Sequence, residues 1–511
     1  MRSFFVLALV GSLGFLAGCG SSGTPAGIPI TISLSPTSAT VNANGVVNVV
    51  ATVANDSTNA GVSWTLSGVG TLSNQTTTSV TYTAPATVTT TSVATVVATS
   101  KASSAVTASL PITVSPAGTI ANVVPISVNG GPLTTANPPS IYANGVFVSV
   151  QICAPSGACQ TIPDVLVDTG SVGFRVLASQ LNSQVMTGLQ PFTDGSGNTL
   201  YNCIQFADNS FLWGTVAPAT IVLGGETATS TSVQVIATPS FTIPSGCTGT
   251  NEDTQQTLSA NGILGIGAEP FDCGAACDQV ANPQGPIPLV YYFCSSGGTC
   301  NATYVPCGQL CEGQSAPDYQ VTNPVFNFAT DNNGVIVELP ALQPAGSSAE
   351  ATVNGQLVFG IGTQSNNALP STATVLNLDT SDSFTTNFAS QSLTGSFIDS
   401  GSNGLFFPDP ALAGSICPGT DSSWYCPTST LTGLSATNVG ATGSPSNTVT
   451  FSVDNFETVT AANPTDAAFS NLAGPNTGGF DWGLPFFYGR NVFTAIDGTT
   501  VGNTPGPFFA Y

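Results

Sequence analysis

Short runs in which apolar and polar residues alternate make up most of the chain, and Gly, Asn, Ser and Pro separate them. Examples from the first part are 46–53 (VVNVVATV), 62–66 (VSWTL) and 93–100 (VATVVATS). A period of two residues places one face of a strand on a core and the other face in solvent. Several such strands close together in the sequence predict an antiparallel β-sandwich over residues 28–116.

The same type of pattern continues to the end of the chain, with few helical periods, so we expect an all-β protein. From about residue 120, aromatic residues and cysteines become more frequent. The region from 123 to 511 is large for one hydrophobic core. We therefore expect a second β domain in two lobes, about 123–320 and 321–511.

Two segments of the second domain repeat one template. Residues 166–176 read LVDTGSVGFRV, and residues 397–407 read FIDSGSNGLFF. The triplet Asp-(Thr/Ser)-Gly occurs easily by chance, so the longer shared template carries the signal. A second matching pair follows the two loops, with NGILGIG at 261–267 and WGLPFFYGRNVFTAID at 482–497. The repeat predicts a duplicated domain with Asp168 and Asp399 in equivalent positions.

The amino-acid composition restricts the catalytic groups that this chain can use. The chain has no histidine and only four basic residues against 26 acidic ones, for a net charge of −22. This excludes Ser-His-Asp and Cys-His catalytic systems, and it argues against binding to nucleic acid or anionic lipid. In an enzyme of this composition the acid–base groups would be carboxylates, and we expect no metal and no cofactor. Few ion pairs would be lost when carboxylates are protonated, which favours tolerance of acid.

The first residues read as a targeting segment. Arg2 precedes an apolar run, 4–16, that is too short to span a bilayer, and the run ends in Leu-Ala-Gly-Cys. This resembles the lipobox of bacterial lipoproteins, which implies a signal peptide at 1–18, a lipid on Cys19 and a flexible linker at 19–27. The residues that follow imply the outer membrane or cell surface. The alternative is an ordinary signal peptide in which a Cys falls by chance.

Twelve further cysteines lie between Cys153 and Cys426. Their local spacing predicts small disulfide loops formed in an oxidising compartment, at positions 153/159, 273/277, 294/300, 307/311 and 417/426. The alternative is a Cys-only zinc site made by 273, 277, 307 and 311.

Residues 28–116 resemble bacterial immunoglobulin-like modules of surface proteins. Trp64 falls where the core Trp of the third strand would lie. The resemblance implies a spacer that holds the second domain away from the membrane.

Residues 123–511 resemble the pepsin-like aspartic peptidases. In that family each lobe presents its Asp-Thr-Gly at a strand tip, and a later apolar-apolar-Gly strand crosses behind it. Residues 263–265 (ILG) and 482–483 (WG) fill those positions. Residues 204–225 resemble the flap hairpin and the next strand, 323–360 the start of the second lobe, and 491–511 the closing strands. The resemblance implies a monomer that binds a peptide or protein substrate as an extended strand.

Two adjacent carboxylates do not both ionise easily, so they share a proton. One can then accept a proton from a bound water while the other donates to the scissile carbonyl. The resemblance implies this role for Asp168 and Asp399. It further implies residues that support the two loops: Thr169 and Ser400 would join them by hydrogen bonds, Gly170 and Gly401 would permit a tight backbone, and Ser171 and Ser402 would support the carboxylates.

Two positions depart from the family pattern. The flap Tyr is replaced by Phe206, and Trp213 is a second candidate for an altered flap. Arg175 stands where an aromatic residue is usual, and near the dyad it would favour ionised carboxylates. Because strand residues alternate between faces, we expect Arg175 to be exposed at a strand end.

The leading hypothesis is an aspartic endopeptidase of the cell envelope. The alternative is a catalytically inactive pepsin-like binding or inhibitor protein, which the missing flap Tyr favours. A glycoside hydrolase with two carboxyl groups at least ~5 Å apart is a third hypothesis, and a surface scaffold without a site is a fourth.

Overall fold

The computed structural model describes residues 29–36, 39–88, 91–116, 122–136, 139–237, 243–283, 285–307, 318–342 and 348–511. The expected signal peptide, Cys19 and the linker to residue 27 lie outside these residues, as does Cys311. Strands dominate and the α-helices are short, namely α1 (Ser183–Gly188), α2 (Gln255–Leu258) and α4 (Phe456–Ala462). The expectation of an all-β protein is confirmed. In the part of the chain that is described, no helix has the length and apolar character needed to cross a membrane.

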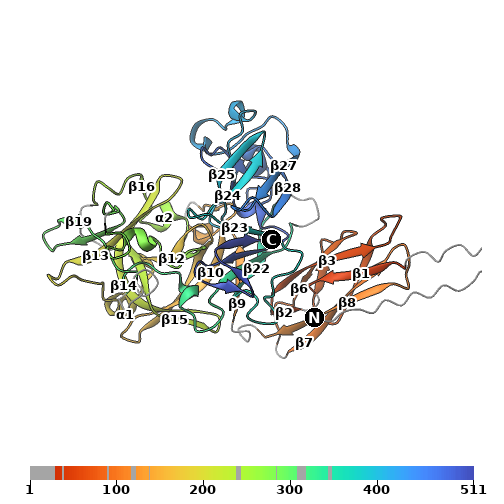
Figure 1. The fold of residues 1–511 in the computed structure, drawn as a ribbon, viewed down its shortest axis with the longest axis horizontal. Coiled ribbons are helices and arrows are strands. Elements are labelled where there is room, and N and C mark those ends of the chain that lie inside the picture. The colour runs from red at the N-terminus through yellow and green to blue at the C-terminus, as the bar shows by residue number, and fades with distance from the viewer. Residues whose placement is uncertain are drawn as a thin grey trace, which may run out of the picture.

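Two four-stranded sheets face each other in the N-terminal part (Figure 1). One has the order β1 (Thr31–Ser35), β3 (Val46–Ala54), β6 (Ser79–Thr83), β5 (Thr71–Ser73), and the other β2 (Ala39–Asn42), β8 (Thr107–Ser115), β7 (Ser92–Ser100), β4 (Val62–Ser67). Trp64, Tyr82 and Ile112 belong to the core between them. Alternate residues of β7 are buried, as the sequence pattern predicts for one face of a sandwich.

One long sheet forms the centre of the remaining chain. Its strands follow the order β19 (Cys300–Ala302), β18 (Tyr291–Cys294), β13 (Thr199–Gln205), β14 (Ser210–Leu223), β15 (Glu226–Ile236), β12 (Val172–Leu177), β17 (Gly262–Ile266), β11 (Cys159–Asp168), β10 (Val146–Cys153), β9 (Val123–Val128), β22 (Val353–Phe359), β20 (Gly334–Leu339), β32 (Arg490–Ala495), β35 (Phe508–Ala510) and β23 (Val375–Asn377).

A smaller sheet projects from this one and carries the cyan and blue strands at the top of Figure 1. Its order is β28 (Ser446–Val453), β27 (Leu431–Val439), β24 (Phe384–Phe388), β25 (Gln391–Ile398), β31 (Asp481–Trp482), β26 (Leu405–Phe406) and β30 (Ala473–Gly474). A single buried core extends from the long sheet into the smaller one and includes Phe174, Phe480 and Trp482.

The internal repeat seen in the sequence is a five-strand unit in the structure. In the first repeat, β10 and β11 form an antiparallel pair, β17 lies between β11 and β12, and β15 runs parallel to β12. In the second repeat, β24 and β25 form the antiparallel pair, β31 lies between β25 and β26, and β30 runs parallel to β26. The crossing strands expected at 263–265 and 482–483 are therefore present behind both Asp loops.

Four disulfides join the neighbours that spacing predicts: 153–159, 273–277, 294–300 and 417–426. A fifth, Cys203–Cys247, joins residues far apart in the sequence and was not predicted. Cys307 is also disulfide-bonded. The zinc alternative is wrong, because Cys273 and Cys277 are bonded to each other and Cys307 has no free thiolate. Within the described ranges, no group of three or more possible metal ligands occurs.

Candidate active site

The two Asp loops touch at their tips through reciprocal hydrogen bonds. The amide of Thr169 donates to Oγ of Ser400 at 3.1 Å, and the amide of Ser400 donates to Oγ1 of Thr169 at 2.9 Å. Each hydroxyl then donates to a carbonyl of the opposite repeat, Thr169 to Ile398 at 3.2 Å and Ser400 to Val167 at 2.7 Å. All of this is buried. The hydrogen bonds expected of Thr169 and Ser400 are present, and they fix the two repeats to each other.

Each carboxyl is supported by its own loop. Oδ1 of Asp168 accepts from the amides of Gly170 at 2.9 Å and Ser171 at 3.1 Å, and the Ser171 hydroxyl donates to Oδ2. Oδ1 of Asp399 accepts from the amide of Gly401 at 2.7 Å, and Oδ2 accepts from the hydroxyl of Ser402 at 2.9 Å. Both serines thus contact the carboxylates as expected.

One backbone amide joins the two carboxyls. The N–H of Gly170 donates to Oδ1 of Asp399 at 3.1 Å as well as to Oδ1 of Asp168. The two Oδ1 atoms therefore lie side by side around a single donor. The sequence does not predict this contact, because most of the second domain separates the two aspartates along the chain.

The two loop glycines have a different role from the one expected. Neither Gly170 nor Gly401 has a positive φ, so neither is needed for an unusual backbone. A Cβ at Gly401 would lie 2.7 Å from Cγ of Asp168, and one at Gly170 would lie closer still to Cγ of Asp399. Each glycine leaves the space that the carboxyl of the opposite loop occupies.

Burial and the neighbouring carboxylate act together on Asp168. Its side chain is 6% exposed, and burial raises its pKa well above the usual value. The negative charge of Asp399 and hydrogen bonding to that side chain raise the pKa of Asp168 further. Asp168 therefore keeps its proton to higher pH than an exposed aspartate does.

A third carboxyl, Asp481, reaches the dyad through Ser402. Oγ of Ser402 lies 2.6 Å from Oδ2 of Asp481 and 2.9 Å from Oδ2 of Asp399. Burial raises the pKa of Asp481 well above the usual value, and the charge of Asp399 adds to the rise. A hydroxyl has one proton to donate. When Asp481 is protonated it can donate to Ser402, which leaves the Ser402 proton for Asp399.

Sequence reasoning missed Asp481, although a register comparison of the repeats would have found it. Asp481 pairs with Phe397 in the second repeat as Ile263 pairs with Leu166 in the first. The signal in the sequence was Asp481 on the crossing strand of the second repeat, at the position where the first repeat has Ile263.

Strands β13 and β14 form a hairpin, and Phe206 lies at its turn. Phe206 and Tyr142 pack against the same buried cluster, which includes Leu212 and Ile263. Burial raises the pKa of Tyr142, and negative charges that include those of Asp399 and Asp168 add to the rise. A phenol therefore does lie near the dyad, but it comes from the segment before β10 and not from the hairpin.

Trp213 lies on the same hairpin as Phe206, opposite Cys203. Its side chain is 4% exposed, stacks on Tyr201 with 4.9 Å between ring centroids, and meets Tyr292 edge-on. Trp213 is near the start of β14, and its ring packs in a buried cluster with Tyr201 and Tyr292.

Arg175 is fully buried, so the expectation of an exposed side chain is also wrong. The strand that carries it lies between β15 and β17, and both of its faces are covered. The guanidinium donates to Asn202 at 2.8 Å and Gln234 at 2.7 Å, and pairs with Asp272 at 3.0 Å. Because Asp272 supplies the opposite charge, Arg175 is neutralised away from the dyad.

Comparison with known proteins assigns most of the chain to a family. No curated protein matches the chain. The model of one protein family, described as "Protein of unknown function (DUF3443)", matches residues 118–511. The match includes both Asp loops and Asp481, and it begins after the last strand of the sandwich. Since it covers most of the chain, this protein belongs to the DUF3443 family.

Proposed function

We propose that this protein is an aspartic endopeptidase that hydrolyses peptide bonds with Asp168, Asp399 and an activated water. In this proposal the second domain is a pepsin-like bilobal domain and the sandwich is an Ig-like module. The observation that carries the proposal is the single amide of Gly170 that binds Oδ1 of both aspartates, within loops joined by reciprocal hydrogen bonds.

The reaction follows from one proton shared by two carboxyls. The ionised partner accepts a proton from water as the water oxygen attacks the scissile carbonyl carbon, and the protonated partner donates to the carbonyl oxygen. The tetrahedral intermediate then breaks its C–N bond: a proton from the dyad passes to the leaving amine, and one hydroxyl of the intermediate returns its proton to the dyad as the new C=O forms. The products are a carboxylic acid and an amine, and the dyad returns to its starting protonation.

Residues beside the dyad support this chemistry. The link from Asp481 through Ser402 supplies a hydrogen bond to Asp399 that is independent of the Asp168 loop. The rings of Phe206 and Tyr142 pack in one cluster with Leu166, which precedes the first Asp loop. An extended peptide would lie beneath the β13–β14 hairpin and bind through its backbone.

A second candidate is a catalytically inactive binding or inhibitor protein of the same fold. Phe206 favours it, because the hairpin presents no hydroxyl at that position. The glycosidase hypothesis is weakened by the shared Gly170 amide, since glycosidase carboxyls stand at least ~5 Å apart with substrate between them. Both aspartates accept hydrogen bonds from their own loops at matching positions. These contacts weaken the hypothesis of a surface scaffold without a site.

The proposed location is the cell envelope, with a lipid on Cys19 that anchors the protein to the outer membrane or cell surface. The disulfides support an oxidising compartment. Cys19→Ser should move the protein from the membrane fraction to the soluble fraction, and an unchanged distribution would remove the lipid anchor from the proposal.

The test of catalysis is a peptide-library digest from acid to neutral pH with the wild type, Asp168→Asn and Asp399→Asn. We expect cleavage by the wild type in acid, and a loss of at least ~10³-fold in each variant. The matched control is Glu457→Gln, a carboxyl removed from an exposed position. A statine-type inhibitor should block the wild type. Absence of cleavage at every pH would instead support the inactive binding protein.

A further inference from the structure

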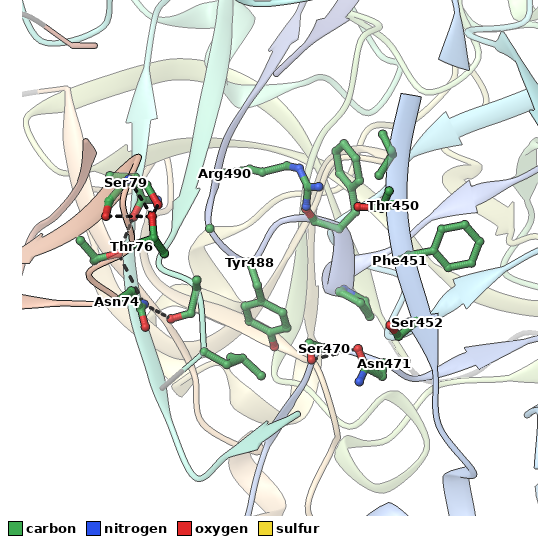
Figure 2. Close-up of a pocket in the computed structure, with 18 of the residues that line it drawn as sticks. Asn74, Thr76, Ser79, Thr450, Phe451, Ser452, Ser470, Asn471, Tyr488 and Arg490 are labelled. Carbon is green, nitrogen blue, oxygen red and sulfur yellow. Dashed lines mark hydrogen bonds between the residues drawn. The ribbon is translucent and has the colours of Figure 1, made fainter. Parts of the chain in front are cut away.

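The sandwich and the second repeat enclose a cavity of about 400 Å³. The sandwich is held there by two hydrogen bonds, from Asn48 Nδ2 to the carbonyl of Leu339 at 3.1 Å and from Asn74 Nδ2 to the carbonyl of Ala341 at 2.5 Å. Figure 2 shows residues of the sandwich on one side of the cavity and strand β28 on the other, with Tyr488 and Arg490 between them. The cavity is therefore built by parts of the chain that are distant in sequence.

Arg490 is the only charged residue that lines the cavity. Its Nη1 donates to the carbonyl of Phe486 at 2.6 Å, and the guanidinium lies 4.5 Å from the centroid of the Phe486 ring. A guanidinium has five N–H donors, so one carbonyl leaves most of them without an acceptor. The described residues place no carboxylate within ion-pairing distance of Arg490, since their single ion pair is Arg175–Asp272.

The contrast with Arg175 shows what Arg490 lacks. Arg175 is fully buried and has a carboxylate and two side-chain amides as acceptors, whereas Arg490 is partly exposed and has a single backbone carbonyl. Burial lowers the pKa of Arg490, and the nearby phenol of Tyr511 acts in the opposite direction. A guanidinium that faces a cavity and has no carboxylate beside it can pair with an anion that enters. In a chain of net charge −22, Arg490 is therefore a site where an anion from solution can bind.

The rest of the wall indicates the body of the ligand. Phe451, Phe486 and Trp482 form an aromatic side, and Val50 of the sandwich is 48% exposed at the cavity. The other polar lining groups are uncharged amides and hydroxyls, such as Asn471. A volume of this size suits a small organic molecule.

We propose that this cavity binds an organic carboxylate with an apolar or aromatic body, its carboxylate on Arg490 and its body against Phe451 and Val50. Arginine binds carboxylates through two parallel N–H···O bonds. A free aromatic acid and the C-terminal residue of a peptide share this chemistry. The proposal does not depend on peptidase activity, because none of the dyad residues lines the cavity.

The test is calorimetric titration of the full chain with 3-phenylpropionate and with the peptide Ala-Ala-Phe, each beside its amide. We expect the acids to bind and the amides to bind at least ~10-fold more weakly, because an amide has no negative charge for Arg490. Arg490→Gln should weaken the acids by a similar factor. Lys101→Gln, which removes a cation from an exposed position outside the cavity, should change nothing. Preference for one acid over the other identifies the source of the carboxylate.

A second variant keeps the test decisive if Arg490→Gln does not fold. Val50→Trp fills the cavity from the sandwich side, at a residue already half exposed, and leaves Arg490 in place. It should abolish binding of both acids. The proposal is overturned if acid and amide bind equally, if either variant binds as the wild type does, or if neither acid binds at millimolar concentration.

Discussion

The two repeats bring the same loop to the site but surround it differently. Asp168 is almost completely buried and faces a crossing strand with Ile263, whereas Asp399 is half-buried and is linked through Ser402 to Asp481. The loops determine where the carboxyls stand, and residues outside the repeated template determine how they hold protons. Two adjacent carboxyls share a proton because they do not both ionise easily, and unequal surroundings bias which of the two carries it.

The similarity of the two Asp loops can be tested first at their glycines, where the largest effect is expected. Gly170→Ala and Gly401→Ala each place a methyl group where the opposite carboxyl lies. Each should lower kcat/KM for a cleaved peptide by ~10²-fold or more, since small misplacements of reacting groups have effects of that size. Gly195→Ala and Gly395→Ala are the controls, because a Cβ at either meets nothing within 4 Å. Full activity in either loop variant would contradict the mutual fit.

Because the hydrogen bonds between the loops are reciprocal, removing the hydroxyl of either loop should lower the free energy of unfolding equally. Thr169→Val and Ser400→Ala each leave a buried amide of the opposite loop without an acceptor. Each should lower the free energy of unfolding by about 1–3 kcal/mol, measured by denaturant titration. Ser109→Ala, at an exposed sandwich position, is the control. A cost confined to one of the two variants would show that the loops are not equivalent.

The asymmetric part of the comparison rests on Asp481. Its pKa is raised in the folded protein, so its contribution to stability is present in acid and is lost as the pH rises through the folded-state pKa. Asp481→Asn cannot titrate, so its thermal midpoint should fall less between acid and neutral pH than that of the wild type. Glu457→Gln should retain the wild-type slope. An unchanged slope in Asp481→Asn would remove the proposed proton link.

The smallest effect is expected at Tyr142, whose phenol packs in the cluster that includes Leu166. Tyr142→Phe removes one hydroxyl from the first-repeat side and keeps the ring that packs in the cluster with Phe206. It should lower kcat/KM less than ~10-fold, the range of a single hydrogen bond, with stability unchanged. Tyr319→Phe is the control, since its ring packs on Phe192. No kinetic change would show that the phenol takes no part.

Much of this architecture was predictable from local patterns. Period-two alternation gave the β class, the repeated template gave the equivalence of Asp168 and Asp399, and short spacings gave four disulfides. Predictions failed where a residue's surroundings come from distant strands. Arg175, which was expected to be exposed, meets Asp272 and Gln234 only after the long sheet has formed.

The sequence by itself determined the class of structure, the duplicated loops and the absence of histidine chemistry, because these depend on composition and on order along the chain. Only the tertiary structure decided that one amide joins both aspartates, that Asp481 stands behind Ser402, and that Arg490 faces a cavity without a carboxylate partner. Strand pairing and domain packing set these contacts, since side chains that are distant in sequence share protons and charges only when the fold places them within a few ångströms of each other.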